Sequence, residues 1–386
     1  MMDVPVFAKK HAPLFYLHST DKYHPTDLST FLQHVRPQID FEDVKPSQPA
    51  LTLADLDQWN TRGDSNGENV YLTSIENVAE EPEWLRGGTG VDNADGVQSY
   101  RPGAIIVVER GGNFVDVFYF MFWAFNHGGK VFSQAFGNHV GDWEHVMIRF
   151  WNGTPTKVWL SQHGHGEAYT FEALEKNAGR QRPVLYVAKG SHAIYPKKGD
   201  SDHVAPNMTT TLPFLLVDQC SDGLLIDPLK VSYPYSYTPV AVRKDSAQSS
   251  RAFRKWCKSR TLPVQEESPS GIFRAIQSWA PRPGWLKFNG HWGDQEYDVD
   301  DPRHQNLPQY RKHGDGPKGP LFNHIDGKPE LGEWLEQWLR KLFSGKKKMK
   351  VQGNPQRIYV DGTPARPKEQ ASVQASGDTF VNTWGG

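Results

Sequence analysis

Residues 137–151 read GNHVGDWEHVMIRFW, in which a glycine-bearing loop runs into a predominantly apolar strand. Side chains alternate between the two faces of a strand, so Asp142 and Glu144 point the same way as the apolar residues that follow at every second position. His139 precedes them in the loop. Three side chains that can bind a metal ion or transfer a proton therefore fall within six positions.

A hairpin is predicted directly after this strand. Asn152-Gly153 is a turn signal, and residues 156–162 then predict a second strand that ends at His163. A two-residue turn would set Asp142 opposite His163, and a loop two residues longer would set Glu144 there. A three-residue loop would flip the second strand's side chains to the other face and disperse the cluster.

Two carboxylates beside imidazoles in an apolar hairpin are costly to desolvate unless they bind a cation or take part in proton transfer. Each residue alone is more simply explained as a loop cap or a structural histidine, so the argument rests on the cluster. Imidazole and carboxylate together suit zinc, manganese or iron, whereas carboxylates with water suit magnesium or calcium. We therefore predict a divalent metal ion, of undetermined identity, bound by His139, Asp142 and Glu144.

Candidate catalytic residues come from the same region. Residues 183–188 predict another strand, and the Gly-Ser turn after it carries His192. A histidine at such a turn is well placed to be a ligand or a catalytic group. We predict Glu144, His163 and His192 as the catalytic candidates.

The rest of the chain predicts a mainly β protein, a β-sandwich with peripheral helices and a disordered polar C-terminal tail. Residues 104–108 and 115–123 flank a glycine turn, and the second run is apolar on both faces, as in a strand buried between layers. Four segments are expected: an extended segment and a helix packed on the core (1–50), the sandwich with the site (51–325), an amphipathic helix and a lysine run (326–350), and the polar tail (351–386).

Two local expectations refine this outline. Leu28, Phe31, Leu32 and Val35 recur at helical spacing and predict a short helix, which Thr26 or Asp27 could cap. Residues 285–294 are aromatic and are expected to add a strand to the sandwich. In the C-terminal helix, a tryptophan-bearing apolar face followed by lysines allows either docking on the core or peripheral contact with an anionic membrane.

Composition limits the classes of function. The formal net charge of −1 over 386 residues gives no field to attract nucleic acid, so a nucleic-acid partner is not expected. Only two cysteines are present, and neither a secretory signal nor a membrane-length apolar run is seen, which predicts an intracellular, cytoplasmic protein. No nucleotide-binding glycine loop and no nucleophile elbow occurs in the required strand-to-helix context.

The central motif, together with residues 161–163, 186–193 and 292–294, resembles the fungal vacuolar protein sorting-associated protein 62 family. The resemblance extends over most of the chain. It implies a link to protein transport towards the vacuole and names no molecular activity.

The motif is also similar to the GHRHDWE heptad of necrosis- and ethylene-inducing-like proteins, β-sandwich cytolysins that hold a divalent cation and bind plant sphingolipid head groups. His139, Asp142, Trp143 and Glu144 match this heptad, and the other three positions differ. The resemblance implies a cation at the matching residues.

Three classes of function follow. The first is a vacuolar-sorting family protein with a divalent-metal site. The second is a metal-dependent hydrolase, lyase or cyclase that acts on a glycan or a fungal small metabolite, with Glu144 or His163 as general base. The third is a module that binds a small molecule, a sugar or a lipid head group without chemistry. The sequence does not decide whether the protein is an enzyme, and it predicts no oligomeric state.

Overall fold

The structure is a computed structural model, and every structural statement below concerns the residues that it describes. These are residues 3–44, 51–63, 65–88, 100–111, 113–128, 130–131, 134–135, 137–163, 165–202, 217–239, 271–304, 312–323, 325 and 358–359. The predicted amphipathic helix and lysine run (326–350), and all but two residues of the predicted tail (351–386), lie outside them.

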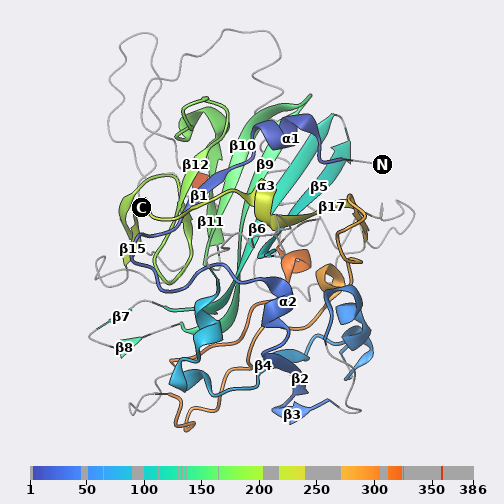
Figure 1. Cartoon of the computed structure of the whole chain (residues 1–386), viewed down its shortest axis with the longest axis vertical. Helices are drawn as coiled ribbons and strands as arrows, with labels where there is room; N and C mark the ends of the chain where they lie inside the picture. Colours follow the sequence, from blue (N-terminus) through green and yellow to red (C-terminus); the bar gives the residue numbers. More distant parts are fainter. Residues whose placement is uncertain are drawn as a thin grey trace, which may run out of the picture.

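An eight-stranded sheet forms the centre of the molecule (Figure 1). Its strand order is β18-β17-β5-β6-β9-β10-β11-β19, and every neighbouring pair is antiparallel except β17 and β5. Its strands are β5 (Gly103–Gly111), β6 (Phe114–Asn126), β9 (His139–Trp151), β10 (Thr154–Gln162), β11 (His165–Thr170), β17 (Ser232–Pro239), β18 (Gly271–Ala275) and β19 (Ile358–Tyr359).

Both faces of this sheet are buried, which explains why β6 is apolar at almost every position. One face packs against a second sheet of order β13-β12-β1-β16 and against helix α1 (Val6–Lys10). The mainly β fold class is thus confirmed. The strands of the second sheet are β1 (Leu14–Tyr16), β12 (Val184–Val187), β13 (Ile194–Tyr195) and β16 (Leu225–Ile226).

The opposite face carries a second apolar core. It packs against helix α2 (Leu28–Phe31), a 3-10 helix at Leu53–Thr61, and a small sheet of order β3-β2-β4. The strands of that sheet are β2 (Val35–Ile39), β3 (Glu42–Asp43) and β4 (Tyr71–Ser74).

Short elements make up most of the remaining structure. The β elements are β7 (Lys130–Val131), β8 (Gln134–Ala135), β14 (Gly199–Asp202) and β15 (Val217–Cys220). The helical ones are α3 (Pro228–Val231) and 3-10 turns at Val78–Glu80, Glu83–Arg86, Phe171–Ala173, Trp285–Lys287 and Pro320–Phe322.

One local expectation is confirmed except for the length of the helix, and another is wrong. Helix α2 ends at Phe31 and Val35 begins β2, so the helical spacing of the apolar residues continues past the end of the helix. Asp27 caps the helix, because its side chain accepts a hydrogen bond from Thr30 N at 2.8 Å. Residues 285–294 form a 3-10 turn and an irregular segment instead of a strand. Their aromatic side chains fill the core, and His291 forms an isolated β-bridge with Tyr71 of β4.

The central hairpin has the predicted turn but a different register. Trp151 pairs with Thr154, which confirms the two-residue turn at Asn152-Gly153. The ladder then shifts between Pro155 and Lys157, because a proline has no N–H to donate and the strand bulges there. Beyond the bulge Val146 pairs with Leu160, so the predicted pairing of Asp142 with His163 is wrong.

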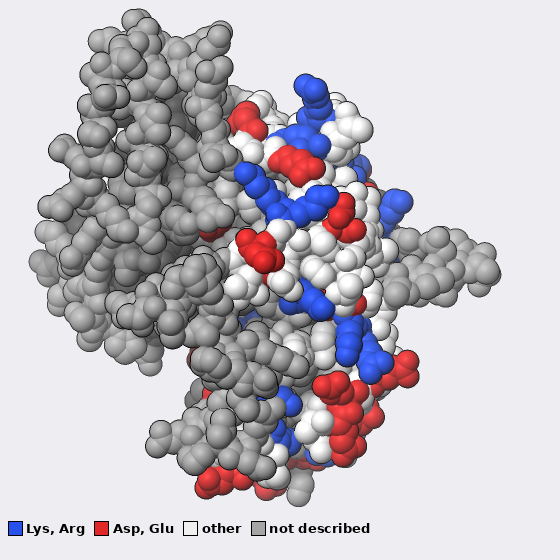
Figure 2. Space-filling model, turned by 90° about the vertical axis from the view of Figure 1, so that its left-hand side faces the viewer, with Lys and Arg blue, Asp and Glu red and all other residues white. Residues whose placement is uncertain are grey.

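No helix in the described part of the chain has the length and apolarity needed to cross a membrane. Figure 2 shows basic and acidic side chains interspersed on the described surface of one face, with neither sign covering it.

Candidate functional site

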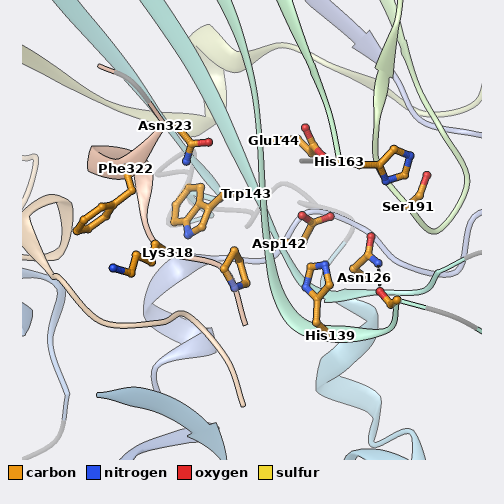
Figure 3. A pocket seen from close by; sticks show the side chains of 12 residues that line it. Asn126, His139, Asp142, Trp143, Glu144, His163, Ser191, Lys318, Phe322 and Asn323 are labelled. Atoms are coloured by element: carbon orange, nitrogen blue, oxygen red, sulfur yellow. Dashed lines mark hydrogen bonds between the residues drawn. The ribbon is translucent and has the colours of Figure 1, made fainter. Parts of the chain in front are cut away.

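A pocket of about 570 Å³ lies where β10 ends beside β9. The ladder between the two strands stops at Val146 and Leu160, so the first residues of β9 extend past the end of β10. Side chains from both faces of β9 consequently border the same space (Figure 3). One group of lining residues is acidic or polar: Asn126, His139, Asp142, Glu144, His163 and Ser191. The other comprises Trp143, Pro317, Lys318, Phe322 and Asn323.

Four of the five predicted site residues line this pocket, and His192 lies behind them. Its ring is completely buried and stacks on Trp123 with centroids 4.5 Å apart. His192 Nδ1 lies 2.8 Å from Asp142 Oδ2. His192 can therefore hold the Asp142 carboxylate in place from outside the pocket, while its Nε2 has no hydrogen-bond partner among the described residues.

Glu144 is only 3% exposed, and the Ser161 hydroxyl donates a hydrogen bond to it. The same hydroxyl oxygen accepts from His145 N at 2.7 Å. Burial, and next the charge of Asp142, raise the pKa of Glu144 well above its usual value. Two carboxyl groups on one strand face thus resist being charged together.

His139 is half-buried at the start of β9, and its Nδ1 lies 2.6 Å from Gly141 O. A carbonyl oxygen only accepts, so Nδ1 carries the ring proton and Nε2 is left as an acceptor. Burial lowers the pKa of His139 despite the neighbouring charge of Asp142, which favours the neutral ring.

His163 reaches the pocket by a route that strand pairing did not predict. It lies in the turn between β10 and β11 with φ of +54°, and His192 has φ of +59° in the turn after β12. Left-handed backbone is unfavourable for residues other than glycine, by about 1–2 kcal/mol each. Both site histidines therefore have their rings positioned by strained turns.

Asp218, in β15, contacts the pocket residue His163 and was not predicted from the sequence. Its carboxylate accepts from Ser191 Oγ at 2.5 Å and from Tyr195 OH at 2.7 Å, and it contacts His163 Nε2 at 2.8 Å. Burial opposes ionisation, but the hydrogen bonds and charge of His163, followed by the two hydroxyls, lower the pKa of Asp218 to about 2. Nothing in the local sequence links this aspartate, which resembles a turn residue, to a histidine 55 positions away.

Replacing Asp218 by asparagine should lower the free energy of unfolding by about 2 kcal/mol at neutral pH, because the folded state stabilises the ionised carboxylate. Because the pKa of Asp218 is lowered, its contribution to folding stability is complete at pH values above the ordinary pKa of 3.8 and is lost as the pH falls towards 2. Urea unfolding near neutral pH and at about pH 3 measures the difference. The exposed Asp222→Asn is the control, and equal losses in both variants at neutral pH would contradict the prediction.

The side chains at these positions fit some divalent cations better than others. No three His, Cys, Asp or Glu side chains converge as a metal centre requires, within the residues that the structure describes. Asp142 Oδ2 and Glu144 accept hydrogen bonds from His192 and Ser161. Two carboxylates on one pocket still suit an oxygen-ligated cation such as magnesium or calcium, for which water or a ligand supplies the other oxygens. They fit a zinc site with four protein ligands less well.

Comparison with known proteins identifies the family. The family described as vacuolar protein sorting-associated protein 62 matches residues 1–203, which include β9 and its hairpin. The chain belongs to the vacuolar protein sorting-associated protein 62 family. The Saccharomyces cerevisiae protein of that name is 31% identical over 344 residues, which cover 84% of this chain and 67% of the relative. A second yeast member of this kind, TDA6, whose name assigns it provisionally to vacuolar protein sorting, is 30% identical over 84% of this chain and 68% of its own length.

Solved structures give a much weaker similarity. Necrosis and Ethylene inducing Protein 2 from the causal agent of cocoa's witches' broom disease is 11% identical, with a TM-score of 0.26 over 51% of this chain and 69% of that one. A structure titled NLPPya in complex with glucosamine has 10% identity and a TM-score of 0.24, over 60% of this chain and 78% of that one. Nothing about function follows from similarities of this size.

Proposed function

We propose that this member of the vacuolar protein sorting-associated protein 62 family is a binding protein whose pocket takes up a divalent cation through Asp142 and Glu144. His139 is the third candidate ligand. One observation carries the proposal: two buried carboxyl groups face the same pocket, and burial together with the charge of Asp142 raises the pKa of Glu144. A divalent cation would neutralise the pair and coordinate oxygen atoms of a polar ligand.

The surrounding residues prepare the pair for this role. His192 holds Asp142, and Ser161 holds Glu144, so both carboxyl groups are positioned before a ligand arrives. The pocket volume of about 570 Å³ suits a small molecule, a sugar or a lipid head group. In this proposal, recognition of such a group is the molecular step behind the family's link to protein transport to the vacuole.

Metal content tests the proposal directly. The purified chain is reconstituted separately with magnesium, calcium, manganese or zinc, desalted and analysed by elemental mass spectrometry. We expect near-stoichiometric cation in the wild type and its loss in the Asp142→Asn/Glu144→Gln double variant. A Glu42→Gln/Asp222→Asn double variant changes the net charge equally at exposed positions and should retain the cation. A folded wild type that retains none of the four cations would overturn the proposal.

A second candidate is a metal-dependent hydrolase, lyase or cyclase acting on a glycan or small metabolite. The observation that favours it is that Asp218 orients His163 at the wall of the pocket that also contains Glu144. Either His163 or Glu144 would act as general base: His163 would accept the proton on a ring nitrogen, and Glu144 on a carboxylate oxygen. Turnover of a glycan or metabolite panel that disappears in Glu144→Gln and His163→Asn would establish an enzyme, whereas cation and ligand binding without turnover would establish a binding module.

A further inference from the structure

We infer that the side of the pocket away from the two carboxyl groups is a subsite for an anionic group, a phosphate or a carboxylate, held by Lys318 and the indole N–H of Trp143. The inference rests on the proposed function only because it places the anionic group and the cation in one ligand pocket. The anion subsite and the cation site can fail separately.

Strand alternation separates the two sides. Trp143 lies between Asp142 and Glu144 in β9, so its side chain points to the opposite face, where it packs against Trp285 and Trp292. In Figure 3 the Trp143 ring lies with Lys318, Phe322 and Asn323 on one side of the strand, and the carboxyl groups lie on the other. One pocket reaches both sides because β10 does not continue beside this part of β9.

Lys318 brings a positive charge to this side of the pocket. Its Nζ lies 4.5 Å from the centre of the Phe322 ring, which holds the ammonium group by a cation–π contact. No carboxylate of the described residues lies within ion-pair distance of it. A half-buried ammonium group that lines a pocket in this way is available to an anion entering the pocket.

Trp143 supplies an unused hydrogen-bond donor beside that charge. The residue is 5% exposed, and its Nε1 is buried with no hydrogen-bond partner among the described residues. Buried N–H groups are nearly always paired in folded proteins, and of the described tryptophans whose buried Nε1 has no partner, Trp143 is the one that lines the pocket. The nitrogen-bearing edge of the ring is turned towards the Lys318 side in Figure 3.

The two sides of the pocket are chemically complementary to a bipolar ligand. The Lys318 ammonium group and the Trp143 indole, whose buried Nε1 has no partner among the described residues, lie on one side of the pocket. The carboxyl groups of Asp142 and Glu144 lie on the other. An anionic group would be repelled by the carboxyl side and attracted by Lys318. The ligand class is therefore a small molecule or head group with an anionic end and a hydroxyl-bearing or cation-coordinated end.

The full chain, with ¹⁵N-labelled indole groups, is titrated with inorganic phosphate in a buffer that contains a chelator. NMR follows the indole N–H signal of Trp143, which is assigned by its disappearance in Trp143→Phe. We expect a saturable shift. Lys318→Met should weaken phosphate binding at least tenfold, while Lys318→Arg and the same-segment control Lys312→Met should bind like the wild type. Circular dichroism and a thermal melt verify that each variant is folded. Absence of a Trp143 shift, or equal weakening in Lys318→Met and Lys312→Met, would overturn the inference.

Two further measurements show whether anion binding is independent of the proposed cation site, and whether the phosphate belongs to a lipid or to a soluble molecule. The Asp142→Asn/Glu144→Gln variant should bind phosphate at least as well as the wild type, because two repelling groups are neutral; loss of phosphate binding there would count against a separate anion subsite. Phosphatidylcholine vesicles containing phosphatidic acid then test a lipid source. Binding that Lys318→Met abolishes supports a lipid head group, and binding of inorganic phosphate alone supports a soluble phosphate ester.

Discussion

Replacing Gly141 by alanine should prevent the chain from folding stably, with a loss of more than about 4 kcal/mol in the free energy of unfolding. Gly141 has φ of +72°, and an added Cβ would lie 1.6 Å from the backbone oxygen of Trp292. That segment cannot easily move away, because Trp292 N donates to Pro317 O at 2.7 Å. The start of β9 and the segment after Gly290 thus approach each other backbone to backbone.

Gly137→Ala is the matched control for this prediction. Gly137 lies in the same motif with φ of +73°, but an added Cβ there would meet nothing within 4 Å. Gly137→Ala should lower the free energy of unfolding only by the cost of placing alanine in a left-handed backbone conformation, about 1–2 kcal/mol. Urea unfolding measures both variants, or soluble expression where Gly141→Ala is too unstable to purify. Similar losses in the two variants would show that the close approach to Trp292 does not matter.

Replacing Asp116 by asparagine should destabilise the sheet by about 3–5 kcal/mol, since it removes the charge of a buried carboxylate that accepts hydrogen bonds from two arginines. Asp116 is 1% exposed and lies opposite Arg149 on neighbouring strands. Its oxygens contact Arg149 Nε at 2.7 Å and Arg110 Nε at 2.8 Å. Chemical denaturation of the variant at neutral pH measures the loss.

The pH dependence of stability provides a second measurement of Asp116. Burial opposes its ionisation, but the hydrogen bonds and charges of Arg149 and Arg110 outweigh it and hold the pKa below its ordinary value. The contribution to stability is therefore present above the unfolded-state pKa and is lost as the pH falls through the folded-state pKa. The exposed pair of Asp55 with Arg282 is the control, and Asp55→Asn should change stability little. A small effect of Asp116→Asn would contradict the prediction.

The sheet was largely predictable because its signals are local. Apolar runs bounded by turn residues correctly indicated β5, β6, β9, β10 and β12. Alternation within β9 also assigned Asp142 and Glu144 to one face, with Val146 and Ile148 further along it. These inferences use residues of a single strand, in which side chains alternate between the two faces in the order of the sequence.

The arrangement around the pocket was not predictable in the same way. Register in the hairpin depended on a bulge beside Pro155, which turn length alone does not reveal. Asp218 and Lys318 reach the pocket region from distant parts of the chain, and no periodicity connects them to β9. The helical spacing that continued to Val35 was overridden because that residue pairs with Ser74 in a sheet.

The left-handed turns at His163 and His192 have a consequence for how this protein can evolve. Glycine or asparagine would adopt either backbone conformation with less strain, so the contacts made by the two histidine rings must offset that strain in the folded protein. Such replacements would remove the rings that contact Asp218 and Asp142. Loss of the proposed binding role would therefore leave these two histidines under weaker selection than the sheet that supports them.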